Sequence, residues 1–317
     1  MIANPIQPFL ERYGVLILDG GLATELEARG HDLSDSLWSA RLLRDNLQAI
    51  KQVHLDYLRA GADCIISASY QATIPGYVQH GLSEAQAVSL LQRSVELARE
   101  ARDSFWETVQ HTGERLRPLV AASIGPYGAY LADGSEYSGR YGLDQAALIA
   151  FHRRRWQILV ESAPDVLACE TIPSAVEARA LAHLLSETPD TVAWFSFSCR
   201  DEQHISDGTR LRECVEWLDA FPQVVAIGVN CTAPRFVPAL IAEARRVSRK
   251  PIIAYPNSGE TYDVGQKRWL GLSIPADFAQ QSGRWREAGA ALIGGCCRTR
   301  PDHIREIRVR QRVEGEG

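Results

Sequence analysis

The sequence predicts a (β/α)8 barrel of the TIM type that spans residues 1–317 as a single domain. Three observations support this fold class. Short runs rich in β-branched residues alternate with longer amphipathic segments along the whole chain, which is typical of βαβ units and a parallel sheet. Eight such runs can be counted, as a closed barrel requires. The 317 residues contain no internal repeat or low-complexity linker, so nothing indicates a second domain.

The predicted strands are short and apolar. They are Val15–Gly20, Cys64–Ser69, Leu119–Pro126, Val166–Thr171, Val192–Cys199, Val224–Cys231, Pro251–Asn257 and Ala291–Cys297. An open, doubly wound sheet is the alternative. No glycine-rich dinucleotide-binding turn follows the first run, so the barrel is the preferred interpretation.

The predicted helices lie between these strands, and several begin with residues that start or cap helices. Ser83 and Ser174 precede two of them, and Pro234 and Pro275 stand at first-turn positions. The clearest amphipathic segments are Asn46–Ala60, Glu84–Asp103, Asp144–Ser162, Ser174–Glu187 and Pro234–Arg246.

Two connections are longer than the rest. Tyr127–Gly142 and Ser258–Ser273 follow predicted strand ends and are rich in glycine, tyrosine and charged residues. Barrel enzymes assemble their active sites from the loops on this face, so both are predicted to cover an active site. The alternative is that they are ordinary surface loops.

Composition excludes several functional classes. A net charge of −5 with scattered basic residues argues against nucleic acid as a partner. No apolar stretch approaches the roughly 18 residues needed to cross a bilayer, and the N-terminus lacks the pattern of a signal peptide. Seven cysteines, an odd number, suit a reducing compartment, so we expect a cytoplasmic location. The oligomeric state is left open.

Three cysteines at the ends of two predicted strands form the most informative pattern. Cys231 ends the sixth strand, and Cys296 and Cys297 end the eighth. Zinc with three protein ligands and one open position is the pattern of a catalytic site, and such a zinc can hold a substrate thiol as a thiolate. Adjacent cysteines in a regular strand point to opposite faces, so the glycines at 294 and 295 are expected to end the strand by their conformational freedom. The alternative is a chance pair of buried cysteines.

Carboxylates at other strand ends predict an amino-acid site. Asp19, followed by Gly20 and Gly21, and Glu170 could hold an ammonium group, while backbone N–H groups at the glycines could hold a carboxylate. The fourth, sixth and eighth strands share parity in a barrel, so Glu170 and the three cysteines could face one point near the axis. The alternative for Asp19 is a tight turn in which it binds local backbone.

Other residues near strand ends have weaker cases. Cys199 could compete as a metal ligand, and the run Ser123–Pro126 is better explained as a turn than as a catalytic element. No histidine stands at a strand end or at metal-ligand spacing on a helix. No catalytic residue beyond the zinc site is therefore expected.

Motifs along almost the whole chain resemble the homocysteine S-methyltransferase family, whose members are zinc-dependent barrels. The resemblance rests on Leu18–Gly21, Ser67–Gln71, Ala168–Thr171, Gly228–Cys231 and Gly294–Cys297. It implies zinc ligands at Cys231, Cys296 and Cys297. It also implies that homocysteine is bound by Asp19, Gly20 and Glu170, with Ser69 and Asn230 as further contacts.

Two further runs resemble the branch of this family that uses S-methylmethionine or S-adenosylmethionine. These are Ala132–Tyr137 and Tyr255–Glu260. The implied reaction is zinc-dependent methyl transfer from a sulfonium donor to the thiolate of L-homocysteine, which gives methionine. Cation–π contacts could hold the donor. The candidate aromatic residues are Tyr70, Tyr127, Tyr130, Tyr137, Tyr255 and Trp269.

The sequence also allows other functions. One alternative is a methyltransferase of the same fold that acts on another thiol or on a selenol. Another is a non-catalytic zinc or redox sensor that uses the paired cysteines. Carboxylates beside the thiols favour an amino-acid substrate over the sensor.

Overall fold

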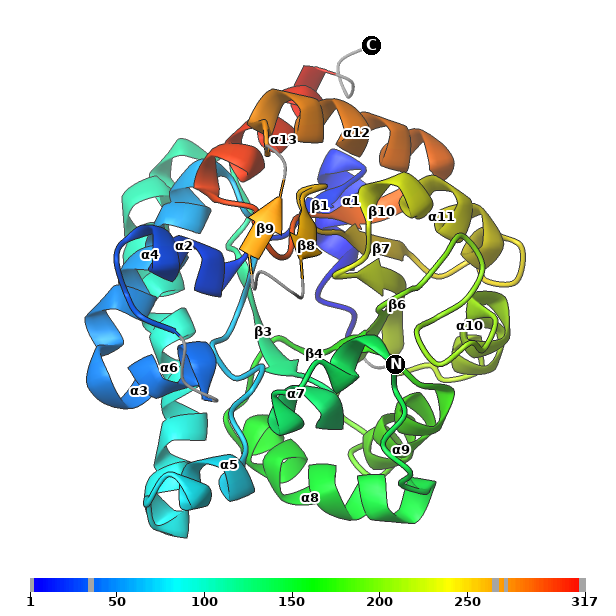
Figure 1. The fold of residues 1–317 in the computed structure, drawn as a ribbon. Coiled ribbons are helices and arrows are strands. Elements are labelled where there is room, and N and C mark those ends of the chain that lie inside the picture. Colours follow the sequence, from blue (N-terminus) through cyan, green and yellow to red (C-terminus); the bar gives the residue numbers. More distant parts are fainter. Residues whose placement is uncertain (1–2, 34–36, 264–267, 271–272, 314–317) are drawn as a thin grey trace.

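The computed structural model describes residues 3–33, 37–263, 268–270 and 273–313. Eight parallel strands form one sheet, and an isolated parallel bridge between Leu18 and Cys64 joins its two edge strands into a barrel. Figure 1 shows helices arranged in a ring around the strands, which confirms the predicted fold class. In sheet order the strands are β1 (Leu16–Ile17), β10 (Ala290–Ile293), β7 (Ile252–Tyr255), β6 (Val224–Asn230), β5 (Ala193–Phe197), β4 (Val166–Ile172), β3 (Leu119–Ile124) and β2 (Cys64–Ile66).

Helices connect successive strands. The α-helices are α1 (Gln7–Tyr13), α2 (Leu22–Ala28), α3 (Leu42–Asp45), α4 (Leu47–Ala60), α5 (Ile74–Gln79), α6 (Glu84–Val109), α7 (Tyr127–Leu131), α8 (Gln145–Glu161), α9 (Ala175–Ser186), α10 (Leu211–Asp219), α11 (Val237–Arg245), α12 (Pro275–Ala288) and α13 (Pro301–Val313). Short 3-10 helices are η1 (Trp38–Arg41), η2 (Gln110–Thr112), η3 (Ser135–Tyr137) and η4 (Pro234–Phe236).

The predicted helix starts are confirmed at the residues that cap them. Ser83 and Gln86 form a reciprocal capping box at the start of α6. The Ser174 hydroxyl accepts the backbone N–H of Glu177 at the start of α9. Helix α6 continues to Val109, six residues beyond the predicted end.

Two apolar layers hold the barrel together. The larger lies between the strands and the outer helices, and the smaller fills the barrel interior. Helix α1 packs against the interior layer next to residues that begin strands, because Ile6 and Phe9 are almost fully buried against Leu119 and Val166. The N-terminal segment therefore closes the end of the barrel opposite the strand C-termini.

Seven of the eight predicted strands were too long at their C-terminal ends, and β4 runs one residue beyond its predicted end. Strand β1 stops at Ile17, β2 at Ile66 and β10 at Ile293, so the polar residues that follow stand in turns. Turns release these side chains from the strict alternation of a strand, so neighbouring residues can face the same point.

The two long connections contain regular structure that the sequence analysis did not predict. The first holds α7 and η3, and the second holds an antiparallel hairpin of β8 (Thr261–Asp263) and β9 (Arg268–Leu270). In the described part of the chain, no helix has the length and apolar character that a membrane span requires.

Candidate metal centre

The sulfur atoms of the three predicted cysteines lie together at the C-terminal end of the barrel. Their Sγ atoms are all within 4.8 Å of one another. The Cys231 sulfur is 3.1 Å from that of Cys296 and 3.5 Å from that of Cys297. A disulfide would measure about 2.05 Å, and sulfurs bound to one tetrahedral zinc at about 2.3 Å would be roughly 3.8 Å apart. The three thiols thus fit a shared metal ion after a small expansion.

Local backbone conformation brings the thiols to this point. Strand β6 ends one residue before Cys231, which has a left-handed backbone with a φ of 49°. A left-handed backbone is unfavourable for residues other than glycine, and such strained conformations are common at functional sites. The backbone N–H of Cys296 donates to the carbonyl oxygen of Pro256 at 2.8 Å. The end of β7 therefore positions the turn that carries the other two cysteines.

The glycines before the cysteine pair are needed for space and not for unusual dihedral angles. Neither Gly294 nor Gly295 has a positive φ, so the predicted reason for them was wrong. A Cβ on Gly295 would lie 2.3 Å from Thr299 Oγ1, and one on Gly294 would lie 2.6 Å from the Cβ of Leu18. The chain after β10 therefore passes too close to its neighbours for any side chain.

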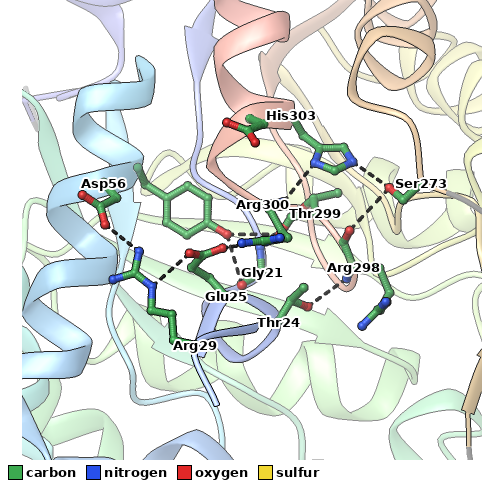
Figure 2. Close-up of polar contacts among 12 residues, drawn as sticks. Gly21, Thr24, Glu25, Arg29, Asp56, Ser273, Arg298, Thr299, Arg300 and His303 are labelled. Atoms are coloured by element: carbon green, nitrogen blue, oxygen red, sulfur yellow. Dashed lines mark hydrogen bonds and ion pairs between the residues drawn. The ribbon is translucent and has the colours of Figure 1, made fainter. Parts of the chain in front are cut away.

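A network of polar contacts fixes the cysteine turn to the loop that follows β1 (Figure 2). The hydroxyl of Tyr57 is 3.1 Å from the carbonyl oxygens of both Gly21 and Thr299. The backbone N–H of Gly21 donates to Thr299, and the hydroxyl of Thr299 donates to the carbonyl oxygen of Cys296 at 2.7 Å. The sequence analysis predicted that N–H groups at these glycines could hold a substrate carboxylate. The N–H of Gly21 is instead bonded to Thr299 and is not free for that role.

The other side of the turn is tied to the connection that carries the β8–β9 hairpin. Ser258 N–H donates to the carbonyl oxygen of Cys297 at 3.0 Å, and Glu260 pairs with Arg298 at 2.9 Å. At the far end of this connection, Ser273 bonds His303 and the carbonyl oxygen of Arg298 (Figure 2). Both ends of the connection are therefore attached to the turn that bears Cys297.

The thiols share protons within the cluster. Hydrogen bonds from Cys231 and Cys296 lower the pKa of Cys297 well below its usual value. The same contacts raise the pKa of Cys296, because its proton is held in the cluster and a neighbouring thiolate opposes a second charge. One thiolate stabilised by two thiols is a ready first ligand for a cation.

Asp19 and Glu170 are both buried near the thiols. Asp19 accepts the N–H of Ile66 at 2.8 Å, and burial together with the charge of Glu170 raises its pKa well above the usual value. Ser123 and Tyr255 donate to the two carboxylate oxygens of Glu170. Burial raises the pKa of Glu170 to about 7 despite these donors, and the nearby Cys231 adds to the rise.

The other predicted substrate contacts have structural partners of their own. The Ser69 hydroxyl is fully buried and donates to the carbonyl oxygen of Ser123 at 2.8 Å. The amide of Asn230 makes two 2.7 Å hydrogen bonds to Thr171, whose backbone is left-handed with a φ of 58°. Gly20 lies against Tyr57, since a Cβ there would approach the ring within 2.9 Å. These residues shape the backbone beside Asp19 and Glu170.

The predicted donor aromatics divide into two groups. Tyr127 and Tyr130 pack on Phe151, away from the thiols, and Tyr255 is buried under Glu170. Tyr137 and Tyr70 form the other group: the hydroxyl of Tyr137 is 3.5 Å from Cys231 Sγ, and burial together with the charge of Cys231 raises the pKa of Tyr70. The side chain of Trp269 lies outside the described part of the structure.

The sequence analysis did not identify Glu136 and Ser123 as residues of the site, and it named Cys199 only as a competing metal ligand. Glu136 lies beside Tyr137 on η3, and its charge interacts with that of Cys231. Ser123 was interpreted as part of a turn, yet its hydroxyl binds Glu170. Cys199, the competing ligand, contacts the carbonyl oxygen of Phe197 and is not part of the thiol cluster.

Comparisons with known proteins agree on one family. The family model for homocysteine S-methyltransferase matches residues 16–310. The chain is 53% identical to homocysteine S-methyltransferase YbgG of Bacillus subtilis, with 96% of each chain covered, and 49% identical to a selenocysteine Se-methyltransferase of Brassica oleracea, with 95% of this chain and 90% of that protein covered. The metallated form of the Escherichia coli homocysteine methyltransferase MmuM superposes with a TM-score of 0.87 at 48% identity, over 97% of this chain and 100% of that one.

Proposed function

This chain belongs to the homocysteine S-methyltransferase family, and on that premise we propose that it uses zinc held by Cys231, Cys296 and Cys297 to methylate homocysteine from a sulfonium donor. The observation that carries the proposal is the convergence of three thiols with no fourth protein ligand in the described residues. A three-ligand site leaves room for a substrate sulfur. Membership of an enzyme family argues against the sensor alternative.

The donor set fits zinc. Three sulfur ligands that are free of disulfides suit a metal with borderline-soft character, and the relative MmuM is described in a metallated form. Bound zinc would supply the chemistry that a thiol acceptor needs, because coordination displaces the thiol proton and keeps the sulfur as a thiolate at neutral pH.

Asp19 and Glu170 would hold the ammonium group of homocysteine. Both carboxylates are almost fully buried, and this burial is the main reason why their pKa values are raised. A bound cation would offset this cost and favour the ionised carboxylates. The hydrogen bonds from Ser123 and Tyr255 would keep Glu170 oriented toward the substrate.

The residues around the thiols would act by alignment and not by proton transfer. The thiolate electron pair forms the new S–CH3 bond while the S–CH3 bond of the sulfonium breaks, and the leaving sulfur keeps that electron pair as a neutral thioether. No proton moves in this step, so no general base is required. In-line displacement instead requires that both sulfurs be held close and collinear with the methyl group.

The direct test is methionine formation from homocysteine with S-methylmethionine and, separately, with S-adenosylmethionine. We expect product with at least one donor, and we expect Cys297→Ala to lose both bound zinc and activity. Cys199→Ala is the matched control, because it removes a thiol at a neighbouring strand end outside the cluster. Zinc content and methionine are measured together. A metal-replete protein that forms no methionine with either donor would overturn the proposal.

A selenol acceptor is the second candidate function, because one relative at 49% identity is named a selenocysteine Se-methyltransferase. Competition between homocysteine and selenocysteine at equal concentrations, with a limiting donor, ranks the two acceptors. Preferential methylation of selenocysteine would replace homocysteine as the proposed substrate.

A further inference from the structure

Glu136 is a carboxylate fixed beside the thiol cluster. It sits on η3, next to Tyr137, whose hydroxyl is 3.5 Å from the Cys231 sulfur. The Ser198 hydroxyl donates to the carbonyl oxygen of Glu136 at 3.1 Å. Gly128 packs so closely that a Cβ there would lie 2.3 Å from Glu136 N. Contacts from two sides thus hold the backbone of Glu136 in place.

One carboxylate oxygen of Glu136 has no partner. Its Oε2 atom is buried and makes no hydrogen bond within the described residues. Buried acceptors in native proteins are almost always satisfied, so such an exception calls for an explanation. A buried carboxylate oxygen without a donor is unfavourable, because it has lost its hydration and gained no hydrogen bond in exchange.

The charges near Glu136 make this position more costly still. The charges of Cys231 and Asp133 both raise its pKa, and burial is the largest contribution, so the pKa rises to about 7. A bound cation would offset this cost and favour the ionised form of Glu136.

The proposed reaction brings two molecules with cationic groups to the site: homocysteine carries an ammonium, and S-methylmethionine carries a sulfonium and an ammonium. The ammonium of homocysteine already has Asp19 and Glu170 as acceptors in the proposed function. The sulfonium donor is the other cation, and it must approach the same thiolate from elsewhere. Its positive charge needs a counter-charge that is not used by the acceptor.

We propose that Glu136 is the counter-charge for the cationic methyl donor and so determines donor affinity. This inference rests on the proposed function and deepens it, because it assigns a donor-side residue that acts apart from Asp19 and Glu170. Tyr137, on the same 3-10 helix, places its hydroxyl 3.5 Å from the Cys231 sulfur, so Glu136 stands one residue from a direct contact with the thiol cluster. Glu136 is a binding residue in this proposal and takes no part in bond making.

The experiment compares Glu136→Gln with Asp133→Asn. The first change removes the charge and keeps the shape. The second removes a charge from the same loop, where Asp133 is exposed and bonds only its neighbour Ser135. Calorimetry on zinc-loaded protein gives the Kd of S-methylmethionine and of the same sulfonium without its amino group, and steady-state kinetics gives the KM of homocysteine.

We expect Glu136→Gln to weaken S-methylmethionine binding by about 10–100-fold, the lower part of the range for close charge pairs at binding interfaces. Zinc content and the KM of homocysteine should stay at the values of Asp133→Asn. If only the amino-bearing donor weakens, Glu136 binds the ammonium. If both donors weaken, Glu136 faces the sulfonium. Either result supports the inference.

Equal donor Kd values in the two variants would overturn it. So would a loss confined to the KM of homocysteine. This failure is distinct from failure of the proposed function, in which the unmodified protein would form no methionine from any sulfonium donor.

Discussion

Replacing Asn230 with alanine tests whether this residue is a substrate contact or a support for the backbone. Its amide accepts the Thr171 N–H and donates to the Thr171 hydroxyl, both at 2.7 Å. Asn230 is fully buried, and Thr171 keeps its left-handed conformation directly after Glu170. The amide therefore stabilises the irregular part of β4, between Cys169 and Ile172, that carries Glu170.

The expected loss of stability follows from these two contacts. Asn230→Ala leaves the buried N–H of Thr171 unsatisfied, at about 1–3 kcal/mol, and removes one hydrogen bond of the Thr171 hydroxyl, which also bonds Tyr70, at about 0.5–1.5 kcal/mol. Partial relaxation of the left-handed conformation of Thr171 recovers some of this, since such a conformation costs about 1–2 kcal/mol. A net loss of about 2–4 kcal/mol is expected. With an unfolding entropy of about 2.1 cal/mol/K per residue over 317 residues, this corresponds to a fall in Tm of about 3–6 °C.

The assay is thermal unfolding of metal-free protein, followed by kcat/KM for homocysteine after zinc loading. We expect both to fall, because a displaced Glu170 holds the substrate ammonium less well. Thr171→Gly in the Asn230→Ala background should recover part of the stability, since glycine accepts a positive φ without strain. A double-mutant cycle then gives the coupling between the two residues.

One result would refute the reasoning. If Asn230→Ala lowered kcat/KM for homocysteine but left the Tm of metal-free protein unchanged, Asn230 would be a substrate contact and not a support. A second refuting result would be additive effects of Asn230→Ala and Thr171→Gly on Tm. The amide of Asn230 would then not stabilise the left-handed conformation of Thr171.

Three further predictions concern stability and the metal. Burial lowers the pKa of His54 to about 4, and neither ring nitrogen has a partner among the described residues. The neutral imidazole therefore stabilises the fold above about pH 6.5, and the free energy of unfolding should fall by up to about 3 kcal/mol as the pH drops from there through 4. His54→Leu should flatten this loss in denaturation curves measured against pH, and equal slopes would contradict it. Glu260→Gln weakens the half-buried ion pair with Arg298, so chelator-driven zinc release should quicken, while Asp302→Asn, at an exposed pair, should leave the rate unchanged. Phe9→Ala should cost about 3–5 kcal/mol in chemical denaturation and leave kcat unchanged below the transition, because Phe9 seals the end of the barrel remote from the thiols.

Much of the fold could be predicted from sequence because the signals are local. Strand and helix periodicity, the capping serines and the first-turn prolines each act within a few residues, and all predicted strands form the barrel. The thiol cluster could also be predicted, because parallel strands bring their C-terminal ends to one face. The parity of β4, β6 and β10 then places Glu170 near Cys231 and Cys296.

Other features depend on contacts between distant residues, which leave no local pattern. The tie from Tyr57 to Thr299 spans 242 residues, and the Glu136 carboxylate owes its position to Gly128 and Ser198. The hairpin within 258–273 lacks the alternating apolar pattern of a buried strand, so the sequence indicated only a loop. Most strand ends were predicted too far along the chain, because the polar residues that follow each strand were counted as part of it.

The sheet order has a consequence for biosynthesis. Strand β10 is the last to be made, and it inserts between β7 and β1, the first strand. It is followed immediately by two of the three clustered thiols, and the third precedes them by 65 residues. A nascent chain that still lacks β10 therefore has an open barrel and only Cys231 of the three clustered cysteines. In the proposed function, the zinc site would therefore be complete only after β10 and the two cysteines that follow it have been synthesised.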